Sequence, residues 1–297
     1  MNPSEADPAA RRAEIAALRP ELHRYCARLA GSAFDGEDIV QDAIARALAA
    51  VDALEPGVPL RPWLFRIAHN RALDHLRSQA VRRSEPIEAA AQVAEDRAHD
   101  PDEALARKQA ATAAFSRFAE LPILQRSVVI LKDVLDHSLQ DIAGLLDLSI
   151  DSVKGALHRG RTRLRQLGAK PEPGPARPPT ADAIRFSALF NARDWDALRT
   201  LLAEDVHLTQ TTLADRRGRR EVGIFFTTYA TIADFHLKPA RLDGSGEEVI
   251  AVFGNHADEA PAYLMQVQWR DGRIARIRDF RYAPYILDNA RLVFPRP

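Results

Sequence analysis

Two segments of this sequence carry arginine and lysine at helical spacing, a pattern suited to contact with a polyanion. Between Arg61 and Arg83 there are six arginines and a single acid, Asp74. Between Ser149 and Lys170 there are six cations and again a single acid, Asp151. Because arginine and lysine side chains neutralise phosphates, the two segments predict contact with nucleic acid at two separate places.

The second basic segment belongs to the pattern SLQDIAGLLDLSIDSVKGALHRGRTRL, from Ser138 to Leu164. Its apolar residues predict two amphipathic helices joined by a tight turn at 147–149, and Ser149 can cap the second helix. This is a helix-turn-helix pattern, whose second helix enters the major groove of DNA. A solvated basic helix in an ordinary bundle is the alternative. The candidate DNA-contacting residues on its outer side are Ser152, Lys154, Gly155, His158, Arg159 and Arg163.

The first basic segment, LRPWLFRIAHNRALDHLRSQAVRR from Leu60, predicts a long helix with Pro62 near its start. A protein that holds an unpaired DNA strand needs cations for the phosphates and aromatic or amide groups for the bases. On its own the pattern is also compatible with aromatic residues that belong to a core. The residues that could supply this chemistry are Trp63, Asn70, Arg71, Asp74, His75 and Arg77.

A third candidate surface is acidic and precedes both basic segments. Apolar residues recur at helical spacing from Val40 to Val51 and predict a buried stripe. The opposite side of that helix then carries Asp38, Gln41 and Asp42.

The order of these motifs closely resembles that of extracytoplasmic-function sigma factors, over about residues 11–168. The resemblance implies that Asp38, Gln41 and Asp42 dock on the clamp-helix coiled coil of the largest polymerase subunit. It implies that the helix around 70–77 opens and reads the −10 promoter element and that the helix-turn-helix reads the −35 element. The segments that carry the resemblance are EDIVQD (37–42), WLFRIAHN (63–70), LDHLR (73–77), LP (121–122) and VKGALHRGR (153–161).

The implied partners are therefore core RNA polymerase and promoter DNA, with no cofactor and no metal. An anti-sigma partner and a small-molecule ligand stay open. The sequence departs from the family at Ala156, where many members carry a basic residue, and at Gly160, where many carry another small residue. The absence of a base-reading arginine would remove roughly 1–3 kcal/mol of discrimination, so we expect an altered −35 preference.

Composition and periodicity set the domain plan. The chain has 297 residues, no net charge and one cysteine, Cys26, which excludes an internal disulfide framework. No apolar run is long enough to span a bilayer, so we expect a cytoplasmic protein without a membrane partner. The predicted fold is multidomain, with two all-α domains followed by an α+β domain. The expected boundaries are 11–83 and 103–168 for the sigma domains, 84–102 for an acidic linker, 169–180 for a proline-rich linker, and 181–297 for the last domain.

The last domain resembles the SnoaL-like group of the NTF2-like cone fold, which implies a curved sheet around an apolar pocket. Helical patterns around 184–189 and 195–202 precede strand patterns at 207–212, 249–254, 262–270 and 273–282, with a helix at 221–231. Asp271-Gly272 is a strong hairpin signal. His207 and Asp279 could form an acid/base pair, although a structural histidine is favoured. The candidate pocket residues are Trp195, His207, Phe226, Tyr229, Trp269 and Asp279.

Three functional interpretations follow. The favoured one is a sigma factor whose last domain regulates it without catalysis. A helix-turn-helix regulator with a ligand-sensing cone is the second, and the acidic face at Asp38–Asp42 argues against it because a simple regulator has no use for such a module. A cone enzyme fused to a DNA-binding module is the third.

Overall fold

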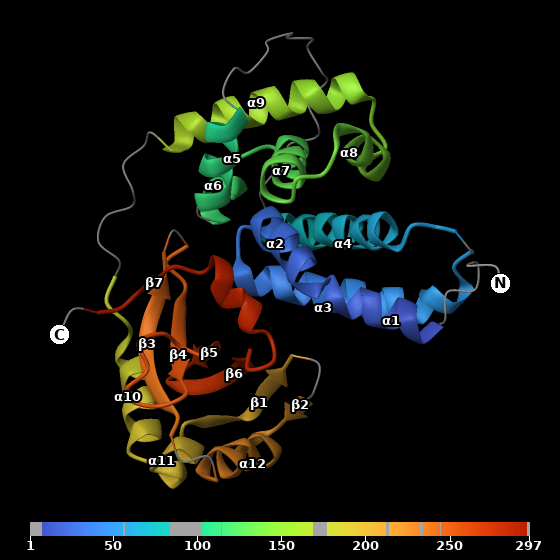
Figure 1. Cartoon of the computed structure of the whole chain (residues 1–297). Coiled ribbons are helices and arrows are strands. Elements are labelled where there is room, and N and C mark those ends of the chain that lie inside the picture. The colour runs from blue at the N-terminus through green and yellow to red at the C-terminus, as the bar shows by residue number, and fades with distance from the viewer. Residues whose placement is uncertain are drawn as a thin grey trace. The chain divides into compact units, whose positions relative to one another are not determined.

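The computed structural model divides into two compact units, Met1–Glu172 and Pro173–Pro297 (Figure 1). It describes residues 8–55, 57–83, 103–113, 115–168, 177–211, 214–231, 234–243 and 245–295. The expected acidic linker at 84–102 and residues 169–176 of the proline-rich linker lie outside the described residues. Each unit has a hydrophobic core of its own.

Unit 1 is helical throughout its described ranges, as the periodicity predicts. The polymerase and DNA candidates lie on its third, fourth and last helices. The elements are α1 (Pro8–Ala17), α2 (Arg19–Ala30), α3 (Ala33–Ala50), η1 (Val51–Ala53), α4 (Leu60–Arg83), α5 (Glu103–Thr112), α6 (Phe115–Ala119), α7 (Ile123–Val129), the π-helical η2 (Ile130–Val134), α8 (Leu139–Leu146) and α9 (Ile150–Gly168).

Short polar side chains fix the ends of the helices that carry these candidates. The Ser32 hydroxyl accepts the N–H of Asp35 at 3.3 Å at the start of α3. Ser138 and Asp141 form a reciprocal capping box at the start of α8. Ser149 accepts the N–H of Ser152 at 3.1 Å at the start of α9, so the predicted cap is confirmed.

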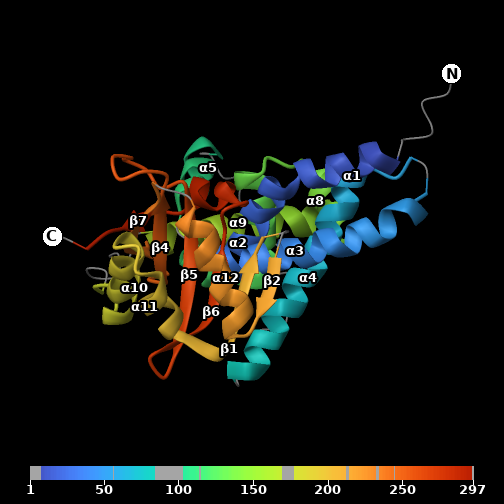
Figure 2. The same cartoon turned by 90° about the horizontal axis from the view of Figure 1, so that it is seen from below.

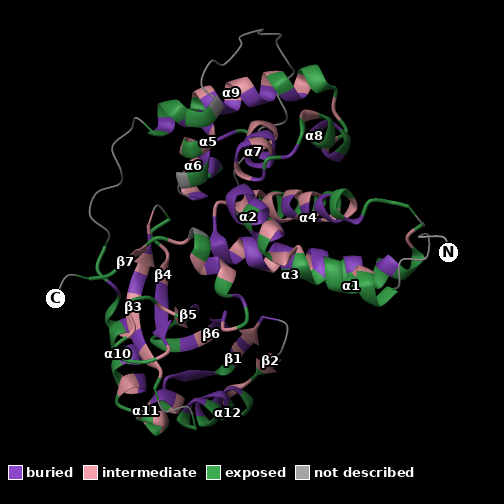
Figure 3. Ribbon diagram, in the orientation of Figure 1, coloured by how far each residue is buried: buried purple, intermediate pink, exposed green. Residues whose placement is uncertain are grey.

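One continuous core runs through unit 1, and Figure 3 shows buried residues in α2, α7 and α9. The stripe predicted from Val40 to Val51 lies inside this core. Cys26 is fully buried, and burial raises the pKa of its thiol, so this cysteine behaves as a small apolar residue.

Unit 2 is a mixed α+β domain, as expected. Its seven-stranded sheet has the order β2-β1-β6-β5-β4-β3-β7, and the β1–β6 pair is parallel while the other pairs are antiparallel. Figure 2 shows β4, β5 and β6 side by side. The elements are α10 (Ala181–Asn191), α11 (Trp195–Thr200), β1 (Leu202–Gln210), β2 (Ala214–Arg217), α12 (Arg219–Ala230), β3 (His236–Leu242), β4 (Glu248–Phe253), β5 (Tyr263–Arg270), β6 (Arg273–Asp279), η3 (Pro284–Asn289) and β7 (Leu292–Val293).

Several details of unit 2 differ from the sequence prediction. Strands β2, β3 and β7 have no counterpart in it, and Leu202 lies in β1 although the apolar spacing places it in the preceding helix. Proline usually argues against a strand, but β3 tolerates Pro239 because only its last two residues pair with β7, which leaves Pro239 unpaired on that side. The predicted hairpin at Asp271-Gly272 is confirmed, with φ of 52° and 68° at its two central residues.

Within the described ranges, no helix is both long and apolar enough to cross a membrane.

Candidate nucleic-acid and polymerase interface

The acidic candidates lie on the side of α3 that faces away from the core. Gln41 is exposed, Asp38 is half-buried, and the Asp42 side chain is 42% exposed. Asp42 accepts hydrogen bonds from Arg46 Nε at 3.4 Å and from Arg71 Nε at 2.5 Å. The structure therefore brings the three predicted docking residues together on one accessible surface.

The −10 candidates on α4 form a second surface, with one exception. Asn70, Asp74 and Arg77 are exposed, and Arg71 and His75 are partly exposed. Asp74 accepts from Arg71 Nη1 at 2.9 Å and from Arg77 Nη1 at 3.3 Å.

Trp63 differs from the other −10 candidates because it packs against the core of unit 1 from an earlier turn of α4. Its ring is half-buried. Part of the ring is therefore accessible, and the role of Trp63 at the −10 element stays a prediction.

The arginines of α4 are less available than their number suggests. Arg61 forms an ion pair with Glu21 of α2, and Arg66 Nη2 donates to the carbonyl of Gly144 in α8 at 2.5 Å. In this conformation, several cations of the basic segment are thus already engaged by groups of the same chain.

The helix-turn-helix consists of α8 and α9, held against α7 and η2 by a buried ion pair. Arg161 donates to Asp133 through Nε at 2.9 Å and through Nη2 at 2.6 Å, and both side chains are almost fully buried. The sequence pattern places Arg161 among the cations of the second basic surface, and this is wrong because its guanidinium is inside the unit. The pair fixes α9 and so orients its outer face.

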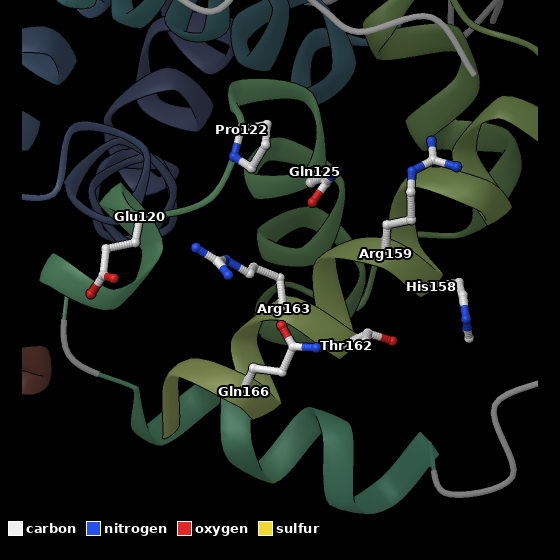
Figure 4. Close-up of a pocket in the computed structure, with 8 residues that line it drawn as sticks. All are labelled: Glu120, Pro122, Gln125, His158, Arg159, Thr162, Arg163 and Gln166. Atoms are coloured by element: carbon white, nitrogen blue, oxygen red, sulfur yellow. The ribbon is translucent and has the colours of Figure 1, made fainter. Parts of the chain in front are cut away.

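That outer face borders a groove of about 520 Å³ (Figure 4). Arg163 is exposed, Arg159 and His158 are half-buried, and Arg163 points toward Glu120 and Pro122 across the groove. Sequence reasoning missed the groove because α6 and α7 build its far side. The lining residues are Glu120, Pro122, Gln125, His158, Arg159, Thr162, Arg163 and Gln166.

The remaining −35 candidates lie on the first turns of α9. Lys154 is exposed and its Nζ atom lies 3.7 Å from Asp151, while Ser152 and Gly155 are half-buried. All six predicted residues are therefore at least partly accessible on this helix.

The two departures from the family pattern lie on the inner side of α9. Ala156 is fully buried, so it does not belong to the DNA-reading surface and our expectation of an altered −35 preference loses its basis. A Cβ atom at Gly160 would lie 2.5 Å from Val129 Cγ2 and 3.1 Å from the carbonyl oxygen of Gln125. Glycine at 160 therefore allows α7 and α9 to approach closely.

In unit 2 a buried carboxyl group is the main polar feature of the core. Asp279 Oδ2 accepts from Tyr229 OH at 2.9 Å and from Gln210 Nε2 at 3.0 Å, and Oδ1 accepts the N–H of Arg281 at 2.9 Å. Burial raises the pKa of Asp279 above its ordinary value, although these hydrogen bonds lower it. The hydroxyl groups of Tyr263 and Tyr229 are hydrogen-bonded to each other.

His207 and Asp279 do not form the acid/base pair that the sequence left open, and the structural histidine that we favoured agrees with the observed contacts. His207 Nε2 lies 2.6 Å from Asp215 Oδ1 on the neighbouring strand β2. His207 also alternates with the buried residues Val206 and Leu208, so its side chain leaves the sheet on the face opposite to theirs.

The other pocket candidates belong to the core of unit 2. Phe226 and Tyr229 are buried, and Trp195 and Trp269 pack against the same cluster. In the described ranges, no group of three or more His, Cys, Asp and Glu residues could hold a metal ion.

Comparison with known families gives three matches along the chain. Residues 15–82 match sigma-70 region 2, residues 116–164 match sigma-70 region 4, and residues 183–280 match the SnoaL-like domain. The SnoaL-like domain thus follows sigma-70 regions 2 and 4 in the same chain.

Individual curated relatives match about half of this chain. The sigma factor CnrH of Cupriavidus metallidurans is 33% identical over 45% of this chain and 73% of its own length. The ECF sigma factor EcfG of Rhodopseudomonas palustris is 31% identical over 52% of this chain and 83% of its own length. The solved structure of Mycobacterium tuberculosis SigJ is 22% identical with a TM-score of 0.36, and the match covers 90% of this chain and 95% of SigJ. Two relatives above 30% identity, each matched over more than two thirds of its length, place this chain among the extracytoplasmic-function RNA polymerase sigma factors, which direct core RNA polymerase to promoters.

Proposed function

We propose that three surfaces of unit 1 divide the work of promoter recognition. The outer side of α3 docks on core polymerase, α4 reads the −10 element and α9 reads the −35 element. The observation that carries this proposal is the position of Asp38, Gln41 and Asp42 on one accessible face whose reverse side is buried. Pull-down of the full chain with core enzyme, before and after reversal of these charges, tests it.

The outer side of α9 has the chemistry for reading a duplex. Arg159 and Arg163 supply cations for phosphates or for guanine edges, while Ser152 and His158 add shorter polar groups on the same helix. The capped start of α9 and the Arg161–Asp133 pair hold the helix in one orientation. Such preorganisation favours a specific fit in the major groove.

Reading of the −10 element requires an exchange of partners on α4. Arg71 and Arg77 are paired with Asp74, and Arg71 is also paired with Asp42. Exposed ion pairs of this kind contribute about 1 kcal/mol or less, so DNA phosphates compete with them effectively. Asn70 is then available for the bases of an opened strand. His75 must also change partners, because its Nε2 atom lies 2.8 Å from Gln79 Nε2.

We further propose that unit 1 is closed when free and opens on core polymerase. Helices α4 and α8 touch through Arg66 and the carbonyl of Gly144. The two promoter elements lie about 25 base pairs apart, which at about 3.4 Å per pair is about 85 Å along the duplex. A unit whose −10 and −35 modules are in contact cannot reach both elements at once.

A cross-link tests the need for opening. Arg66→Cys and Gly144→Cys, joined by a short bismaleimide, should abolish transcription from promoters that need both elements, while each single variant keeps it. A Cβ atom at 144 meets no neighbour within 4 Å, and the buried Cys26 does not react. Full transcription by the cross-linked chain would refute the proposed opening.

For unit 2 we propose regulation of the sigma modules without catalysis. Asp279 is buried and already accepts three hydrogen bonds, and His207 is paired elsewhere, so neither is presented to a substrate. A chain that ends at Lys170 should show substantially altered transcription. Unchanged transcription by that chain, together with turnover of a small molecule by the full chain that disappears in Asp279→Asn, would favour the enzyme interpretation.

A further inference from the structure

Unit 2 carries a groove that the proposed function does not use. It has a volume of about 420 Å³, within the range of small-molecule sites. It lies between the end of α10, the chain that enters β3 and the turn that follows β4. The lining residues are Asn191, Arg193, Asp234, Phe235, His236, Asn255, His256 and Ala257.

Hydrogen bonds fix two walls of this groove. The Asn191 side chain accepts the N–H of Leu237 at 2.8 Å and donates to the carbonyl of the same residue at 2.9 Å. On the other side, Asn255 Oδ1 accepts the N–H of Ala257 at 2.6 Å, and Asp258 Oδ2 accepts the N–H of Asn255 at 2.9 Å. A site with fixed walls loses little conformational entropy when a ligand binds.

The polar groups of the groove are mainly cationic or can become so. The rings of His236 and His256 are 4.6 Å apart between centroids, at an angle of 58°. Arg193 Nη2 donates to the carbonyl of Phe235 at 3.4 Å, which places the guanidinium at the edge of the groove. Asp234 is the one acid among the lining residues.

The surroundings of His236 disfavour its charged form. Burial lowers the pKa of His236, and the nearby His256 and Lys238 lower it further. Lys238 lies on the same strand as His236, and its Nζ atom lies 4.6 Å from the centre of the Phe253 ring. A ligand carboxylate at the edges of the two rings would offset this repulsion.

An aromatic surface completes the groove. Phe235 is half-buried, and its ring centre lies 5.6 Å from that of Tyr229 and 6.0 Å from that of Tyr263. The Arg281 guanidinium also lies over this ring, with its Cζ atom 5.3 Å from the ring centre. Phe235 therefore offers a rigid apolar contact, backed by the core, on the part of its ring that Arg281 leaves uncovered. A flat apolar body suits this surface better than a fully polar ion does.

We propose that this groove binds a small organic carboxylate with a flat apolar body. The carboxylate lies at the edges of His236 and His256, on the side of Arg193, and the body lies against Phe235. The site is separate from the buried Asp279 and from the sigma modules, so it does not depend on the roles proposed for them.

Binding at this site is linked to protonation. A bound carboxylate stabilises the imidazolium forms, so the complex takes up protons and the affinity rises as the pH falls through the histidine range. The basic groups that face the site are Arg193, Lys238 and Arg281. The acidic groups are Asp234 and Asp258, and Asp258 accepts the N–H of Asn255.

Calorimetric titration of the full chain with benzoate tests the proposal, with acetate and inorganic phosphate as comparison ligands at one ionic strength. We expect benzoate to bind at least about threefold more tightly near pH 6 than near pH 7.5. Arg193→Gln should weaken binding about tenfold. His236→Gln and His256→Gln should remove the pH dependence, whereas His207→Gln, outside the groove, should leave both quantities unchanged.

Several results would overturn this inference. Tighter binding of phosphate than of benzoate would contradict the apolar body, and equal affinity for acetate would contradict the role of Phe235. No detectable benzoate binding near pH 6, or equal effects of His207→Gln and His236→Gln, would contradict the site itself.

Discussion

Arg71 Nε donates to Asp42 Oδ2 at 2.5 Å, so an ion pair joins the helix that we assign to the −10 element to the helix that we assign to polymerase. Arg46 also donates to Asp42, and Arg71 also donates to Asp74. Substitutions at either position therefore change both a surface and a local pairing. Tests of the two roles must separate these effects.

We expect Asp38→Arg together with Asp42→Arg to abolish binding to core polymerase while the fold stays intact. Both side chains are at least partly exposed, and the loss of surface ion pairs destabilises a protein by about 1 kcal/mol or less. Affinity for core enzyme, measured by fluorescence anisotropy, and the thermal melting curve check the two halves of this prediction.

A charge swap provides the matched control. Asp42→Arg with Arg71→Asp keeps an ion pair between α3 and α4 but removes Asp42, one of the two acids, from the docking face. Binding should stay impaired in the swapped chain. Recovery of full affinity there would show that the pairing, and not the acidic face, matters to polymerase.

The arginines of the recognition helix should contribute to the salt dependence of DNA binding. If Arg159→Ala or Arg163→Ala removes one phosphate interaction, the slope of log K against log salt should fall by about one unit. Gln166→Ala, from the same groove but uncharged, is the control and should leave the slope unchanged. Identical slopes for all three variants and the parent chain would argue against phosphate binding by these arginines.

Removing one partner of the buried ion pair beneath α9 should lower the free energy of unfolding more than replacing both partners with apolar residues. Asp133→Ala leaves the buried guanidinium of Arg161 without its partner and should reduce the free energy of unfolding by about 3–5 kcal/mol. Asp133→Leu with Arg161→Met should recover most of that loss, because it removes both charges. Urea unfolding of the three chains decides the matter, and a double variant as unstable as Asp133→Ala would disprove the explanation.

Unit 1 should lose stability in mild acid through His69. Burial lowers the pKa of His69 to about 4, and Tyr25 OH lies 2.7 Å from its Nδ1 atom. In the unfolded chain His69 therefore binds a proton below about pH 6.5, whereas in the folded chain it does so only below about pH 4. Stability falls as the pH drops through this window, by up to about 3 kcal/mol.

Trp63 is the one tryptophan of a chain that ends at Lys170, so its fluorescence reports the unfolding of unit 1 in urea. His69→Gln should flatten the pH dependence, and His75→Gln, at a more exposed histidine, should not. A parent chain equally stable at both ends of the window would rule out this role for His69.

The helices of unit 1 could be predicted because their signals are local. Apolar spacing in α3 and the capping serine Ser149 act within a few residues, and the structure confirms both. The three candidate surfaces follow from the same spacing, since the residues opposite a buried stripe face outward.

Pairings between distant segments could not be predicted in this way. Arg161 has the pattern of a surface cation, and only the position of Asp133, 28 residues earlier, explains its burial. Ala156 has the pattern of an altered DNA-reading position, and only the packing of α9 shows that it faces inward. The partner of His207 is Asp215 on β2. The sequence of β2, ADRR, lacks the alternation of apolar and polar residues that would predict a strand.

Run-off transcription with core RNA polymerase on a promoter library tests the central claim most directly. The full chain should produce transcripts from a defined subset of promoters that share −10 and −35 sequences. The chain with Asp38→Arg and Asp42→Arg should produce none, and Arg163→Ala should weaken those that depend on the −35 element. Promoter-independent output, or equal transcription by the parent and the charge-reversed chain, would contradict the account.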